Sequence, residues 1–135
     1  MIHQPPRFAA LALTLGLLAG CVTEPSAPAL SGRFGGPMLL VVASDTAAYF
    51  HFVCQVARTG PLRPNAFGVA EERGWAAGTW AGNRPEDFRV VVRQRADTLT
   101  VFSTFIADAN VRTDSHTVRR DEPADYGYWA CLNAT

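Results

Sequence analysis

The chain has 135 residues, and 12 cationic side chains balance 12 acidic ones to give a formal net charge of zero. It contains no lysine, so every cation is an arginine. This balance argues against a nucleic-acid partner, which would require an excess of basic residues. The length suffices for one domain with a modest core.

The N-terminus has the pattern of an export signal. An uncharged run of 11 residues, Phe8 to Leu18, follows Arg7. It is too short to span a bilayer and is typical of the core of a signal peptide. The run ends in Leu18-Ala19-Gly20-Cys21, which resembles the bacterial lipobox. The resemblance implies cleavage before Cys21 and lipidation of that cysteine, whereas an ordinary secretory signal would leave Cys21 as a thiol.

The predicted organisation is a lipoprotein signal peptide over residues 1–20, a lipidated cysteine and flexible tether over 21–31, and a single β domain over 32–135. Several acyl chains on one cysteine hold a protein firmly in a membrane. Val22 stands where many lipoproteins retained at the inner membrane carry aspartate. We therefore expect the cell envelope as location, with the outer membrane, facing the periplasm, in a Gram-negative cell. The expected partners are the membrane, through Cys21, and an envelope protein.

Two cysteines remain once Cys21 is assigned to the lipid. An exported chain with two cysteines usually pairs them, so we expect a disulfide between Cys54 and Cys131. The alternative is that one of them is a reactive thiol. Neither belongs to a Cys-x-x-Cys motif, and no basic neighbours indicate a lowered thiol pKa.

The clearest secondary structure is a β-hairpin over residues 87–106. In Asp87–Arg95 the apolar side chains of Phe88, Val90 and Val92 alternate with arginines, and Ala96-Asp97 makes a tight connection. In Thr98–Ile106 apolar side chains alternate with threonines.

Other strands are predicted from shorter patterns, and no helical periodicity follows residue 31. They are Met38–Ala43, Tyr49–Val56, a hairpin of Ala66–Glu71 and Trp75–Trp80 through Arg73-Gly74, a polar edge strand Val111–Arg119, and Tyr126–Leu132. The predicted fold class is therefore all-β. It is an antiparallel meander of about eight strands, closed as a lipocalin-like barrel or folded as a sandwich, with one disulfide.

Short motifs along the mature chain resemble a group of small exported bacterial β domains. The matching positions are Gly35-Gly36, Cys54, Gly60-Pro61-Leu62, Leu99-Thr100-Val101 and Cys131-Leu132. The group has a tryptophan, a histidine and an acid where this chain has Phe34, Met38 and Val53. A polar site built from that histidine and acid therefore does not carry over, and the group supplies no activity to transfer.

Few residues offer chemistry. His51 is out of phase with its apolar neighbours and is expected to face solvent. Asp114 and His116 would share one face of a strand, but two ligands make no defined metal site. The carboxylates of Glu71–Glu72 and of Glu86–Asp87 are adjacent, so on a strand they point to opposite faces and form no acid–base pair. We expect no catalytic residue, no metal and no cofactor, and a protein that is not an enzyme.

The expected binding surface combines Trp75, Trp80, Arg58 and Arg63. The favoured hypothesis is a lipid-anchored, non-enzymatic envelope domain with a binding or structural role. One alternative is a small barrel that binds an apolar ligand. Another is an inhibitor of an exported hydrolase, with Arg58–Pro64 as its inhibitory loop.

Overall fold

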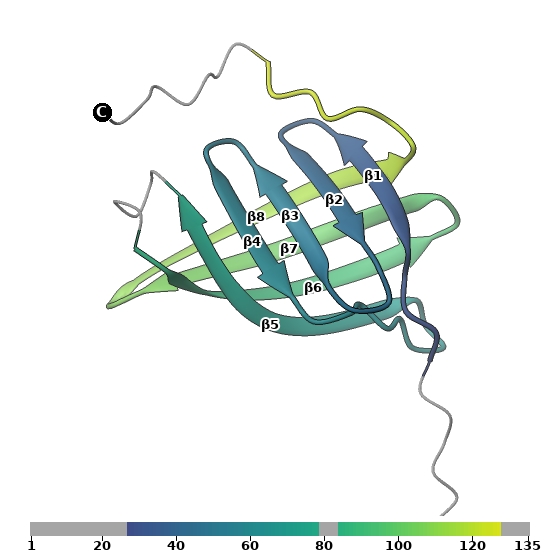
Figure 1. Cartoon of the computed structure of the whole chain (residues 1–135), viewed down its shortest axis with the longest axis horizontal. Coiled ribbons are helices and arrows are strands. Elements are labelled where there is room, and N and C mark those ends of the chain that lie inside the picture. The colour runs from purple at the N-terminus through teal and green to yellow at the C-terminus, as the bar shows by residue number, and fades with distance from the viewer. Residues whose placement is uncertain (1–26, 79–83, 128–135) are drawn as a thin grey trace, which may run out of the picture.

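The computed structural model describes residues 27–78 and 84–127. Eight antiparallel strands follow one another as neighbours and close into a barrel (Figure 1). They are β1 (Gly32–Gly36), β2 (Leu39–Ala43), β3 (Ala48–Phe52), β4 (Gln55–Thr59), β5 (Val69–Gly78), β6 (Glu86–Arg95), β7 (Thr98–Ala107) and β8 (Asn110–Arg120). The all-β prediction is confirmed, and of its two forms the structure has the barrel.

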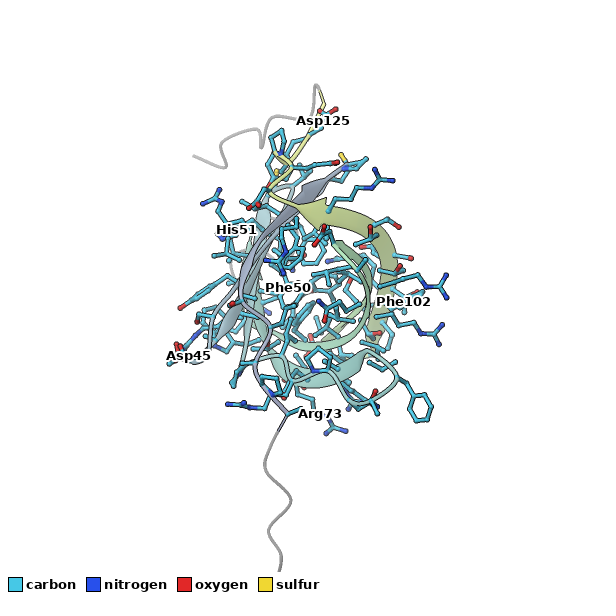
Figure 2. All side chains as sticks on the ribbon, turned by 90° about the vertical axis from the view of Figure 1, so that its right-hand side faces the viewer. Asp45, Phe50, His51, Arg73, Phe102 and Asp125 are labelled. Carbon is cyan, nitrogen blue, oxygen red and sulfur yellow. The ribbon has the colours of Figure 1, made fainter. Side chains whose placement is uncertain are left out.

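Period-two alternation places the core inside the barrel. On β6, Phe88, Val90 and Val92 are buried, and on the neighbouring β7 Leu99, Val101 and Phe105 are buried. Phe88 pairs with Phe105, and Val92 pairs with Val101. The predicted 87–106 hairpin is therefore confirmed in both phase and register. Figure 2 shows Phe50 inside the ring of strands, whereas Phe102 and Arg73 point away from it.

Two predictions are wrong about where the chain turns. The strand predicted over Tyr49–Val56 is the hairpin of β3 and β4, because Val53 and Cys54 form a two-residue turn and Cys54 has a φ of 62°. Cys54 therefore does not lie on an inward strand face, and Val56 faces outward. The hairpin predicted through Arg73-Gly74 is one continuous strand, β5.

The barrel closes through strands that the sequence patterns described poorly. The segment predicted as an exposed edge strand, β8, pairs along its length with β7 and also with β1 at Arg119 and Arg120. β1 itself was not predicted. Tyr126 and Gly127, the start of the predicted last strand, are not in a strand, and the rest of that segment lies outside the described residues.

One end of the barrel is plugged by side chains, and we call it the closed end. Leu30, from the entering chain, and Leu62, from the β4–β5 connection, are buried there, and the Leu30 N–H donates to the Leu62 carbonyl at 2.7 Å. The Arg63 guanidinium also donates to the carbonyl of Ala27 at 2.8 Å. The opposite end, with the β1–β2, β3–β4 and β7–β8 turns, is the open end (Figure 1).

Gly74 is expected to be intolerant of a side chain, because a Cβ there would collide with the Arg58 carbonyl oxygen of β4. Gly74→Ala should lower the free energy of unfolding by about 1–3 kcal/mol, the usual range for overpacking. Urea denaturation measures the loss. Gly60→Ala is the matched control, since the nearest atom to its new Cβ would be Glu72 Oε2 at 3.9 Å. Equal stability of the two variants would contradict the close approach.

Candidate functional site at the open end of the barrel

The inward face of β8 changes from apolar to polar as it approaches the open end. Val118 is buried opposite Leu99, and then His116, Asp114 and Arg112 follow at every second position. Their partners on β7 are Val101, Ser103 and Phe105, all buried. The alternation of the strand therefore carries three ionisable groups into the open end.

Arg112 is held by a chain of polar contacts across the barrel. Its guanidinium Nη2 donates to Gln55 Oε1 at 2.7 Å, and Gln55 Nε2 donates to Glu86 Oε2 at 2.6 Å. Arg112 Nη2 also lies 3.8 Å from Glu86 Oε2, and Arg112 Nε lies 3.9 Å from Asp114 Oδ2. Glu86 has only 7% of its side chain exposed, so it relies on these two partners for solvation.

Aromatic rings form the floor beneath this network. The Arg112 guanidinium carbon lies 4.4 Å from the ring centroid of Phe105, in a cation–π arrangement. Phe105 packs against Phe52 and Phe88, with centroids 5.2 and 5.1 Å apart. The guanidinium is thus fixed from below by a ring and from the side by an amide and two carboxylates.

His116 lies between this network and the core. Its ring centroid is 5.6 Å from that of Phe52, and its Nε2 is buried without a hydrogen-bond partner. Burial lowers the pKa of His116, and the nearby Asp114 carboxylate opposes that shift. The imidazole therefore resists protonation in the folded protein.

A pocket of about 270 Å³ opens among these side chains. Its lining residues are Met38, Phe52, Val53, Gln55, Phe105, Arg112, Asp114 and His116. Ligand pockets usually span about 300–1,000 Å³. This one lies just below that range and suits a single ring or one side chain, because large residues such as Phe50, Phe88 and Leu39 fill the barrel below it.

The predicted binding residues do not meet at the pocket. Arg58 and Trp75 are directly opposite each other on the outer faces of β4 and β5, and Trp75 is 49% exposed. Arg63 lies at the closed end, and Trp80 lies outside the described residues. Cys21 and Cys131 also lie outside them, so lipidation and the disulfide stay predictions.

The remaining predictions about chemistry have mixed outcomes. His51 alternates with inward Phe50 and Phe52 and lies on the outer side of β3, where its ring stacks on that of Tyr49 at 6.5 Å. Asp114 and His116 do share the inward face of β8. Within residues 27–78 and 84–127, however, no group of three or more ligating side chains could hold a metal ion. Over the same ranges no helix is long and apolar enough to cross a membrane.

The network residues Gln55, Glu86 and Arg112 were not predicted as site residues. A phase argument could have found two of them. Glu86 is in phase with Phe88 and Val90 on β6, and Arg112 is in phase with Val118 on β8. A charged residue in phase with a buried set indicates an inward-pointing group near a strand end.

The lowered pKa of His116 predicts a loss of stability in acid. Because the folded pKa lies below the unfolded value of about 6.5, the unfolded chain binds more protons as the pH falls. Stability is therefore complete above about pH 6.5 and decreases as the pH drops through that value toward the folded pKa. His116→Gln should make the melting temperature fall less steeply between pH 7.5 and 5 than in the wild type. Parallel curves for the two proteins would show that His116 is not the responsible group.

Among the shared motifs, Gly35-Gly36 lies on β1, Cys54 in the β3–β4 turn, Gly60-Pro61-Leu62 in the β4–β5 connection and Leu99-Thr100-Val101 on β7, and none of these residues lines the pocket. Cys131-Leu132 lies outside the described residues. The site is therefore described by its own geometry alone. Comparison of the chain with protein-family models, with curated proteins and with solved structures gives no match.

Proposed function

We propose that the protein is a lipid-anchored domain of the cell envelope with a binding, non-enzymatic role. The lipobox-like Leu18-Ala19-Gly20-Cys21 supports the anchor. The polar groups of the described open end support binding rather than catalysis, because Arg112, Glu86 and Gln55 bond to one another around a pocket. The envelope is its proposed location, and the outer membrane its proposed membrane in a Gram-negative cell.

The observation that carries this proposal is the place where the chain enters the barrel. Ala27 and Leu30 are bonded to the β4–β5 connection at the closed end. The six Cα–Cα steps from Cys21 to Ala27 span at most about 22 Å. A lipid on Cys21 would therefore hold the closed end close to the membrane and leave the open end, with its pocket, facing away from it.

Envelope fractionation and mass spectrometry test the anchor. The wild type should be recovered with membranes and carry acyl chains on Cys21. The control is the chain from Val22 onward behind an ordinary cleavable export signal, which should be released from the membrane fraction by high salt and keep the same melting temperature. Recovery of the wild type as a soluble protein with unmodified Cys21 would refute the proposal.

The pocket supports a second candidate, the binding of a small ring-bearing ligand at the open end. Two carboxylates, Glu86 and Asp114, outnumber Arg112, so a cationic ring ligand should be favoured over an anionic one. Benzylamine should shift the His116 imidazole resonances at lower concentration than benzoate does. Equal or absent shifts with both compounds would remove this candidate.

The loop proposed as inhibitory in the sequence, Arg58–Pro64, gains no support as an exposed element. Arg58 and Thr59 belong to β4, Leu62 is fully buried, and Arg63 is bonded to Ala27. These residues close the barrel. The burial of Leu62 and the bond of Arg63 do not favour the inhibitor alternative, which stays an untested prediction that we do not develop.

A further inference from the structure

An unusually exposed aromatic residue lies at the closed end. Phe67, in the β4–β5 connection, has 89% of its surface exposed, more than any other large apolar side chain in the described ranges. Packing does not explain it. Burying a phenylalanine ring is favourable, and the isolated barrel forgoes that gain.

The connection holds Phe67 in a defined position rather than leaving it to collapse onto the barrel. Asn65 Oδ1 accepts hydrogen bonds from the N–H groups of Phe67 at 2.9 Å and Val69 at 3.1 Å. The Gly68 N–H donates to the Asn65 carbonyl, and the Gln94 N–H of β6 donates to the Gly68 carbonyl at 2.7 Å. The turn is therefore fixed by its own side chain and by the barrel.

Phe67 is also next to the entering chain. Pro28–Ser31 and Pro64–Gly68 line one groove together with Gln94 and Arg120. In Figure 1 the β4–β5 connection lies beside the point where the chain joins the barrel. The exposed ring and the tether that leads to Cys21 thus lie on the same end of the molecule.

Unpaired arginines surround this end. Arg63 is exposed in the same connection, and Arg93 and Arg95 are exposed at the end of β6, opposite the start of β5 and next to the Gly68 contact. None of the three forms an ion pair with an acid of the described ranges, whereas Arg120 is paired with Asp97 at 3.4 Å. These three arginines therefore carry positive charge that no acid of the described ranges neutralises through an ion pair.

We propose that the closed end is a membrane-docking face, in which Phe67 enters the interfacial region of the bilayer while Arg63, Arg93 and Arg95 contact anionic lipid headgroups. An aromatic ring flanked by arginines is the composition expected at a membrane interface. The proposed lipid anchor determines which end meets the membrane, and to that extent the inference rests on the proposed function. The anchor then secures the protein, and the face fixes its orientation, with the open end outward.

Vesicle flotation of the unlipidated chain from Val22 onward tests this face independently of Cys21. That chain contains all eight strands and the core. It should float with vesicles of phosphatidylcholine and phosphatidylglycerol at low salt, and much less with phosphatidylcholine alone. Phe67→Ser should reduce partitioning about tenfold or more, and Arg95→Gln about fivefold.

The control is Val111→Ser, which removes an apolar side chain, 65% exposed, from the start of β8 beside the open end and should leave partitioning unchanged. Unchanged melting temperatures will confirm that the variants fold. Absence of flotation with anionic vesicles, or equal losses for Phe67→Ser and Val111→Ser, would overturn the docking face while leaving acylation of Cys21 untouched. Failure of acylation with intact flotation would instead refute only the anchor.

Discussion

Replacing Cys131 with serine is expected to lower the free energy of unfolding by about 4 kcal/mol. A bridge from Cys54 to Cys131 would close a loop of 77 residues along the sequence. In the chain-entropy model, a loop of that size stabilises the folded state by roughly 4–5 kcal/mol. A domain of this size has about 5–15 kcal/mol of net stability, so the loss would remove a large part of it.

The position of Cys54 adds a physical reason to expect the bridge. It is the second residue of the β3–β4 turn and has a φ of 62°, a left-handed conformation that glycine or asparagine adopts more easily. Cysteine brings no backbone advantage there. We therefore attribute the presence of a cysteine at this position to its sulfur atom, which the turn places at the rim of the open end.

Thiol titration of the denatured, unreduced mature protein tests the bridge directly and should find no free thiol. Reductant should lower the melting temperature of the wild type and leave that of Cys131→Ser unchanged. Two free thiols in the wild type, or a melting temperature insensitive to reductant, would show that the strands hold one another without the bridge.

The sequence predicts strands well where one face is apolar and the other polar, as on β6 and β7. It fails where backbone geometry, rather than the alternation of apolar and polar side chains, determines the structure. β1 contains three glycines, and its one large inward side chain, Phe34, gives no alternation. Val53 and Cys54 are not typical turn residues, so the β3–β4 turn is hidden in an apolar run. Gly74 has the appearance of a turn residue, but it is needed because β4 passes too close for a side chain.

The candidate sites could not be predicted from the sequence, for a related reason. Net charge is an average and does not say where the charged side chains lie in the fold. Glu86 and Asp114 converge at the open end, whereas Arg63, Arg93 and Arg95 gather at the closed end, and only the barrel's topology brings together residues so distant in the chain. The exposure of Phe67 likewise depends on the hydrogen bonds of Asn65, which a hydropathy pattern does not contain.

Phe88→Ala is expected to lower the free energy of unfolding by about 3–5 kcal/mol, the usual cost of removing a buried phenylalanine ring. Phe88 is fully buried, and its ring centroid lies 5.3 Å from that of Phe50 and 5.1 Å from that of Phe105. Its partner on β5 is Gly74, which has no side chain to fill the space.

Urea denaturation of Phe88→Ala and Phe102→Ala measures this difference. Both variants lose a phenylalanine from adjacent strands, but Phe102 points outward and contacts Arg93, whose guanidinium carbon lies 5.7 Å from the ring centroid. Phe102→Ala should cost about 1 kcal/mol or less, since an exposed cation–π contact is worth about 0.5–1 kcal/mol. Because Phe105, the floor of the open-end pocket, packs directly on Phe88, the larger loss should be accompanied by altered His116 resonances in Phe88→Ala alone. Equal losses in the two variants would mean that the inward and outward faces of this hairpin are not distinguished as the register requires.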